Sequence, residues 1–289
     1  MDAMFDICYL TSDPNNLEPD DIPQTKEDVW VLGKKYSAIQ ELERIRRDIT
    51  SVIWCTYRKG FVPIGDDGLT SDKGWGCMLR CGQMVLGVAL VRIHLASDWV
   101  WSPETRDPTY LKIVQRFEER KQAPYSIHQV ALMGASEGKE VGQWFGPNTI
   151  AQVLKKLVVY DKWSSLVLHV ALDNTVVSDW LPLLLIVPLR LGLSEINPVY
   201  FDGLKLCFYC PQSIGVIGGK PNQALYLIGC VGDQNKETDE QKEMDCTYHC
   251  RYASRIPMLA MDPSVAVVSI HTNTYARHGS FCRCGQYSY

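Results

Sequence analysis

The stretch that decides the fold is Thr70-Ser71-Asp72-Lys73-Gly74-Trp75-Gly76-Cys77-Met78-Leu79-Arg80-Cys81-Gly82-Gln83-Met84. A polar loop with two glycines leads into Cys77, and from there to Leu95 the only formal charges are Arg80 and Arg92. Apolar residues recur at helical spacing on nearly every side of this segment. The pattern predicts a buried helix that begins at Cys77.

The expected position of Cys77, in the first turn of a buried helix, favours nucleophilic chemistry. Unpaired backbone N–H groups and the helix macrodipole stabilise an anion there, which makes the thiolate available near neutral pH. Gly74 and Gly76 leave room beside the thiol for a substrate backbone. The local pattern allows with equal weight that Cys77 is a small core residue, as most cysteines outside disulfides are.

Four motifs, in the same order, resemble those of the autophagins, the cysteine endopeptidases of autophagy. They are Gly74-Trp75-Gly76-Cys77-Met78-Leu79-Arg80-Cys81-Gly82-Gln83-Met84, Trp144-Phe145-Gly146-Pro147-Asn148-Thr149, Pro182-Leu183-Leu184-Leu185-Ile186-Val187-Pro188-Leu189-Arg190-Leu191-Gly192 and Gly218-Gly219-Lys220-Pro221-Asn222. The resemblance extends from about Val29 to Val267. It implies a papain-like α+β fold, in which a helical half that carries the nucleophile packs on a mostly antiparallel sheet.

The resemblance also implies three site residues. Cys77 is the expected nucleophile, with its own backbone N–H as one oxyanion donor. Tyr57 is expected beside it, where a phenol can donate a hydrogen bond to the oxyanion, and Trp144 is expected to overlook the substrate groove. Chemistry alone leaves both aromatic residues open as ordinary core side chains. We expect no metal and no cofactor.

The apolar periodicity agrees with a helical half followed by a sheet half. Helical spacing predicts helices in 42–53, after Asp107-Pro108, from Ser126 to Gly134 and in 150–158. Short apolar runs predict strands in 166–172, 183–189 and 225–231, and 218–222 is expected to be a loop that feeds the last of them.

The sequence departs from the family pattern in three places. Autophagins continue after the strand matching 225–231 with a further apolar strand and Asp-Pro-His, which supplies the aspartate and histidine of the catalytic triad. Here a charged stretch, 233–245, follows instead, and Asp-Pro-His occurs nowhere in the chain. Residues 176–180 join two segments that the family separates by a helix and a loop. The tail from Ser269 onward does not match the family.

The six histidines offer no convincing substitute for the missing imidazole. His128 and His249 match ordinary positions of the family, and His94 and His169 lie in apolar segments. His271 and His278 lie in the tail. Together with Cys282 and Cys284, the tail histidines could bind zinc. The two cysteines are only one residue apart, however, so a disordered tail is the favoured interpretation.

We therefore expect three parts. Residues 1–28 form an exposed lead-in, 29–268 form the peptidase domain, with internal losses near 178–180 and 233–245, and 269–289 form the unmatched tail. The losses predict an alternatively spliced product or an imperfect gene model.

Composition limits the partners and the compartment. A net charge of −4 provides no electrostatic footprint for nucleic acid. The longest apolar run, Trp180 to Leu189, contains two prolines and is too short to span a membrane. No export signal is recognisable at the start and the 11 cysteines are an odd number, so we expect reduced thiols in the cytoplasm. We also expect a monomer.

The resemblance implies the substrate class. Autophagins cleave ubiquitin-like modifiers of the GABARAP and light-chain type after a C-terminal glycine, and they release the same proteins from phosphatidylethanolamine. The absent Asp-Pro-His favours an alternative, a pseudo-protease that binds these modifiers without turnover. A third interpretation is a fragment that folds poorly, because a lost strand would leave its neighbour with an unpaired edge.

Overall fold

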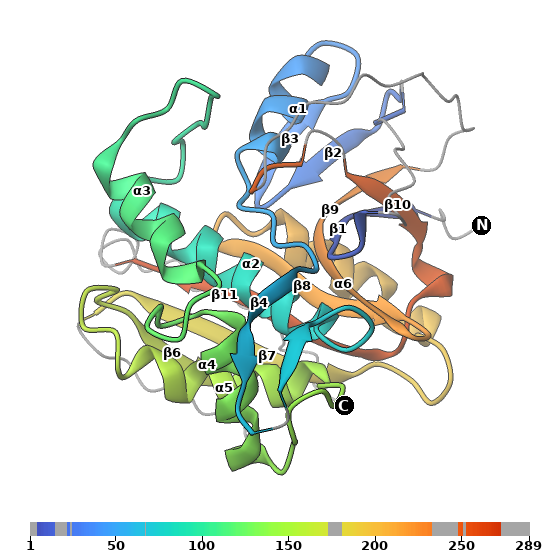
Figure 1. Cartoon of the computed structure of the whole chain (residues 1–289). Coiled ribbons are helices and arrows are strands. Elements are labelled where there is room, and N and C mark those ends of the chain that lie inside the picture. Colours follow the sequence, from blue (N-terminus) through green and yellow to red (C-terminus); the bar gives the residue numbers. More distant parts are fainter. Residues whose placement is uncertain are drawn as a thin grey trace.

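The computed structural model describes residues 5–14, 22–23, 25–66, 68–172, 181–232, 248–250 and 253–272 (Figure 1). The helix predicted at Cys77 is α2 (Cys77–His94), and it packs against a mixed sheet and three further helices. The other helices are α1 (Leu42–Thr50), α3 (Pro108–Val114), α4 (Ile127–Met133), α5 (Pro147–Val158) and α6 (Phe201–Tyr209).

Within the described residues, nine strands form the main sheet, with the order β10-β1-β9-β8-β11-β7-β6 and with β2 paired to β3 and β9. All pairings in it are antiparallel except that of β6 with β7. The strands are β1 (Phe5–Thr11), β2 (Asp28–Val31), β3 (Lys34–Ser37), β6 (Val167–Val170), β7 (Leu183–Arg190), β8 (Ser213–Lys220), β9 (Gln223–Gly232), β10 (Ser254–Pro257) and β11 (Ser264–His271). A separate hairpin, β4 (Lys59–Ile64) and β5 (Leu69–Ser71), precedes the Cys77 loop. The α+β prediction is confirmed.

The helices begin where local chemistry favours it. Asp107 accepts the backbone N–H groups of Thr109 and Tyr110 at the start of α3, and Ser126 accepts that of Gln129 at the start of α4. The helix α5 begins at Pro147, whose fixed φ suits a first turn. The starts of α3 and α4 agree with the sequence pattern, whereas α5 begins three residues before the predicted range of 150–158.

The helix α2 is the core of the helical half. Fourteen of its residues are buried, among them Arg80. Among the described helices it alone is long and apolar enough to cross a bilayer, but 78% of that window is buried inside the protein, as in the core helix of a globular fold. Gly82 allows α5 to approach closely, since a Cβ there would lie 2.5 Å from Ile150 Cγ1.

The sheet separates two apolar cores. The larger one joins α1, α2, α4 and α5 to one face of the sheet, and it includes Cys77. The smaller one lies on the opposite face, where Leu204 and Phe208 of α6 pack against Leu225 and Leu227 of β9. The nucleophile candidate and α6 are therefore on different sides of the sheet.

The region 218–222 is wrongly expected to be a loop. Gly218, Gly219 and Lys220 belong to β8, which pairs directly with β9. Only the turn itself interrupts the hairpin, where Asn222 has a φ of 65°, a left-handed conformation that asparagine tolerates. Gly219 fits the strand because a Cβ there would lie 2.3 Å from the Gln223 carbonyl oxygen, too close for any side chain.

The prediction of an exposed lead-in is wrong for Phe5–Thr11. This segment is β1, which lies between β9 and β10, and Ile7 and Leu10 are fully buried in it. Because β1 pairs with the edge of β9, the edge that was expected to be unpaired is covered.

The tail prediction is wrong for Ser269–His271, which complete β11 beside β7. The predicted internal losses near 178–180 and 233–245 lie outside the described residues, as do His278, Cys282 and Cys284.

Candidate active site

The loop before Cys77 is fixed by a buried carboxylate. Both oxygens of Asp72 accept hydrogen bonds at 2.7 Å, one from the backbone N–H of Arg58 and one from Nε of Arg80. The Asp72 carbonyl accepts the N–H of Gly76 at 2.8 Å. Since Arg80 lies one turn into α2, this buried ion pair ties the loop to the helix and so sets where Cys77 begins.

The Arg80 guanidinium extends this support to the bend at Glu119 and to the next turn of α2. It donates to Glu119 Oε1 at 2.5 Å and to Gln83 Oε1 at 3.1 Å. Burial alone lowers the pKa of Arg80, but the carboxylates of Asp72 and Glu119 raise it by more, so the net shift is upward. Arg80 is therefore a permanent buried cation beneath the loop.

Cys77 is the first residue of α2 and is only 2% exposed. Trp144 Nε1–H donates to Cys77 Sγ at 2.9 Å, and the Tyr57 hydroxyl forms a second hydrogen bond with the same thiol. Burial raises the pKa of Tyr57, and the charge of Cys77 raises it further, so the phenol stays protonated. The structure thus brings Tyr57, Cys77 and Trp144 together, while their catalytic roles remain predictions.

The N-terminal segment completes this site. Ser12 is fully buried, its hydroxyl donates to the Cys77 carbonyl at 3.4 Å, and its own carbonyl accepts the Tyr57 N–H at 2.7 Å. Trp54 Nε1–H donates to the Thr11 carbonyl at 2.8 Å. Sequence reasoning missed these contacts. The signal that could have found them is the β-branched and aromatic run of Phe5–Thr11.

Four of the histidines form hydrogen bonds with groups other than Cys77. His249 donates from Nδ1 to the Thr50 carbonyl at 2.7 Å and accepts the Tyr110 hydroxyl at Nε2 at 2.5 Å. His128 pairs with the Val62 carbonyl at 2.6 Å, and His94 pairs with the Ser164 carbonyl at 3.2 Å. His271 pairs with the Ser269 hydroxyl at 3.0 Å. His169 lies in β6, at the edge of the sheet.

Burial lowers the pKa of His249 to about 4, so this imidazole is neutral at physiological pH. Its ring stacks on Trp101 with centroids 3.8 Å apart. A histidine held in this way is a packed core residue, which agrees with its ordinary position in the family pattern.

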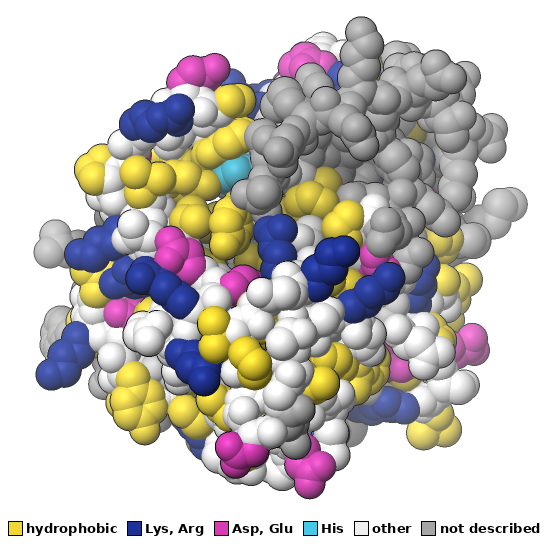
Figure 2. Space-filling view, viewed as in Figure 1, with side chains coloured by type: hydrophobic (Ala, Val, Ile, Leu, Met, Phe, Trp, Pro, Cys, Tyr) yellow, Lys and Arg dark blue, Asp and Glu magenta, His cyan; other side chains and the backbone are white. Residues whose placement is uncertain are grey.

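The face around the site is partly basic. Figure 2 shows Lys and Arg side chains across the middle of this face, over the region of the β4–β5 hairpin in Figure 1. Lys59, the first residue of β4, and Lys73, two residues after β5, are both exposed, and the Arg58 guanidinium lies 5.5 Å from the ring of Tyr248. This side of the Cys77 loop suits a partner with acidic groups.

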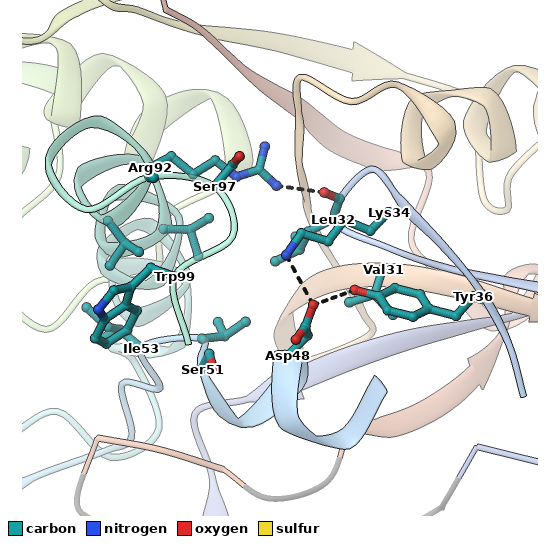
Figure 3. Close-up of a pocket in the computed structure, with 14 residues that line it drawn as sticks. Val31, Leu32, Lys34, Tyr36, Asp48, Ser51, Ile53, Arg92, Ser97 and Trp99 are labelled. Carbon is teal, nitrogen blue, oxygen red and sulfur yellow. Dashed lines mark hydrogen bonds and ion pairs between the residues drawn. The ribbon is translucent and has the colours of Figure 1, made fainter. Parts of the chain in front are cut away.

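A cavity of about 50 Å³ lies elsewhere, between α1, the β2–β3 hairpin and the second half of α2 (Figure 3). Lys34 Nζ and the Tyr36 hydroxyl meet Asp48 Oδ2 at its wall, at 3.1 and 2.6 Å. Val88, the lining residue of α2 nearest to Cys77 in sequence, is about 16 Å further along the helix axis. The cavity is therefore not the site of the thiol. Within the described residues, no three His, Cys, Asp or Glu side chains gather to hold a metal ion.

Comparison with known families decides the class of this site. The model of the peptidase C54 catalytic domain matches residues 42–283, a range that includes Tyr57, Cys77 and Trp144. The chain belongs to the peptidase C54 family. The match also runs beyond residue 268, into the tail that the sequence motifs left unmatched.

Peptidase C54 relatives align along most of the chain. Cysteine protease ATG4B from Xenopus laevis is 46% identical over 310 residues, which cover 91% of this chain and 81% of the relative. Cysteine protease ATG4B from Gallus gallus is 44% identical over 319 residues, with the same two shares. Cysteine protease ATG4A from Homo sapiens is 44% identical over 301 residues, which cover 86% of this chain and 76% of the relative.

Membership of peptidase C54 confirms the papain-like fold and makes the chain a cysteine-type peptidase of autophagy by family. Each of the three alignments is longer than the 289 residues of the chain. The relatives therefore contain residues without a counterpart here. That agrees with internal losses, although their positions remain a prediction.

Proposed function

We propose that this chain acts on ubiquitin-like modifiers of the GABARAP and light-chain type, which it cleaves after a C-terminal glycine and releases from phosphatidylethanolamine. The observation that carries the proposal is the Cys77 thiol at the first turn of α2, hydrogen-bonded to Trp144 at 2.9 Å. Its near-complete burial supports the glycine preference, because a residue without a side chain can approach such a thiol most easily.

The chemistry would run through a thioester. Cys77 Sγ attacks the carbonyl carbon of the glycine, and the oxyanion accepts hydrogen bonds from the Cys77 backbone N–H and the Tyr57 hydroxyl. The carbon–nitrogen bond then breaks as the departing amine takes, through solvent water, the proton that the Cys77 thiol gave up. A second water then hydrolyses the thioester, which gives the glycine carboxylate and regenerates the Cys77 thiol. No imidazole is assigned to this proton transfer, because four of the histidines are hydrogen-bonded elsewhere.

The second candidate is a pseudo-protease that binds the same modifiers without turnover. The absence of Asp-Pro-His from the sequence favours it, since this motif supplies two members of the triad in the family that the chain resembles. The two loops that are expected to form the walls of the substrate groove are not missing, because the Cys77 loop and the Trp144 loop are both present. In either case we propose a monomer in the cytoplasm.

A precursor-cleavage assay tests the first candidate. Losing a triad member costs about 10⁴ to 10⁶ in turnover, so we expect cleavage of a GABARAP-type precursor at least about 10³-fold slower than by a full-length relative. The residual rate should vanish in Cys77→Ala and persist in Cys81→Ala, because only Cys77 lies at the helix N-terminus. Equal loss in two folded variants contradicts the assignment of Cys77.

Titration calorimetry with a glycine-terminated modifier tests the second candidate. Truncation of a buried interface tryptophan costs about 2 kcal/mol, so Trp144→Ala should weaken binding about thirtyfold while Cys77→Ala leaves it nearly unchanged. No detectable binding by a protein that melts cooperatively excludes the pseudo-protease. If cleavage is also absent, both candidates fail.

A further inference from the structure

Two cysteines differ from the others in where they lie. Of the eight cysteines that the structure describes, six are buried, and the two that reach the surface are Cys207 and Cys210. They are three residues apart at the end of α6 (Phe201–Tyr209), where Cys210 is the residue at which the helix stops. Two accessible thiols at this spacing differ in reactivity from the buried thiol of Cys77.

The two residues between the thiols anchor this turn. Phe208 is fully buried in the smaller core, and the ring of Tyr209 stacks on Trp30 of β2 with centroids 4.4 Å apart. The Cys210 carbonyl accepts the N–H of Ser213 at 2.8 Å. Gly33 closes over the same carbonyl so tightly that a Cβ there would lie 2.4 Å from it. These contacts fix where the turn lies against the sheet, while the side chains of Cys207 and Cys210 remain at the surface.

We propose that Cys207 and Cys210 are a redox modification site, which a hydroperoxide converts to an intramolecular disulfide. One thiolate attacks the peroxide oxygen, which gives a sulfenic acid and water or an alcohol. The second thiolate then attacks that sulfur and displaces hydroxide, which a proton converts to water. Two thiols are oxidised by two electrons and the peroxide is reduced by two.

The geometry of the turn permits the bond. Positions three apart on a helix have Cβ atoms about 5–6 Å apart, and a disulfide needs about 4 Å. The gap of roughly 1–2 Å must close by a small backbone movement, which is easiest at a helix end such as Cys210, where helices fray. Each thiol now donates to the carbonyl four residues earlier, at 3.3 Å to Gly203 and 3.4 Å to Leu206. Thiols are weak donors, so releasing these bonds costs little.

This site is independent of Cys77. The helix α6 packs on the face of the sheet opposite to α2, and Cys77 is only 2% exposed. Peroxide should therefore reach Cys207 and Cys210 before it reaches Cys77. The inference does not rest on the proposed function, since it needs neither turnover nor modifier binding.

Intact-mass analysis of the full chain treated with about one equivalent of hydrogen peroxide tests the proposal. We expect a loss of about 2 Da that dithiothreitol reverses, and fragment mapping should place it between Cys207 and Cys210. Cys207→Ser and Cys210→Ser should each abolish the loss. Cys230→Ser is the matched control and should retain it, because Cys230 is buried in the neighbouring strand β9.

Three outcomes overturn the proposal. The first is a 2 Da loss that persists in Cys207→Ser, and the second is one that maps to other cysteines. The third is the addition of oxygen to Cys207 or Cys210 without any loss of about 2 Da. Melting curves identify a variant that fails to fold, and Cys207→Ala then replaces Cys207→Ser.

Discussion

The hydroxyl of Ser12 donates to the backbone carbonyl of Cys77 at 3.4 Å, across a sequence separation of 65 residues. This contact joins the end of the N-terminal strand to the first turn of the nucleophile helix. Because the carbonyl of the same serine accepts the Tyr57 N–H, Ser12 connects two of the predicted site residues. The N-terminal strand is thus a structural part of the site.

The first prediction concerns that strand. Ile7 of β1 is fully buried, so Ile7→Ala should lower the free energy of unfolding by about 2–5 kcal/mol. The matched control is Ile39→Ala, since Ile39 is 60% exposed and its truncation should cost less than about 0.5 kcal/mol. Urea unfolding measures both. Similar midpoints for the two variants would show that β1 does not contribute to the folded core.

A second prediction concerns the hydrogen bond from Trp144 to Cys77. A donor to a thiolate stabilises the charged form by about 1.5–3 kcal/mol, and Trp144→Phe removes the donor while it keeps an aromatic ring in place. Alkylation of Cys77 by iodoacetamide at pH 7 should therefore slow by about tenfold or more. The rate is followed by mass spectrometry against Cys77→Ala as the blank. Faster alkylation would mean that Trp144 acts as a cover for the thiol and not as a donor.

The third prediction concerns the buried ion pair below the loop. Asp72 and Arg80 are 0% and 2% exposed, so Asp72→Ala would leave a buried cation with only Glu119 as its carboxylate partner. Breaking a buried pair in this way costs about 3–5 kcal/mol. The exposed pair of Glu43 and Arg46 provides the control, and Glu43→Ala should cost less than about 1 kcal/mol. Urea unfolding compares the two, and equal costs would contradict a structural role for Asp72.

The sequence predicts local features better than it predicts contacts between distant parts of the chain. The helix α2 is predictable because apolar residues surround it on every side, and the starts of α3 and α4 are predictable because Asp107 and Ser126 are ordinary capping residues. The position of β1 is not, because its register depends on pairing with β9 and β10, far along the chain. The polar stretch after it also favours an exposed segment.

The candidate site divides in the same way. Its residues follow from the resemblance, but the pair of Asp72 and Arg80 does not, since it depends on how the loop folds back over the helix. Local periodicity contains no information of that kind. The contact of Ser12 with Cys77 was missed for the same reason.

The last prediction concerns acid. His249 has an ordinary pKa of 6.5 that burial lowers to about 4 in the folded protein. Between these two values the unfolded chain binds a proton that the folded protein does not, so stability is fully present above pH 6.5 and is lost as the pH falls toward 4. The loss from this one group amounts to about 3 kcal/mol at most.

His249→Phe isolates this contribution, because a phenyl ring can keep the stacking on Trp101 while it cannot bind a proton. Burial also lowers the pKa values of His94 and His271, and these groups act in the same direction in both proteins. Urea unfolding at several values between pH 4 and 7 should therefore show a shallower fall in the variant, by up to about 1.4 kcal/mol per pH unit. The variant loses two hydrogen bonds and is less stable at pH 7, but only the slope is compared. Identical slopes would mean that His249 takes up its proton without unfolding of the protein, and that its hydrogen bonds to Thr50 and Tyr110 open locally instead.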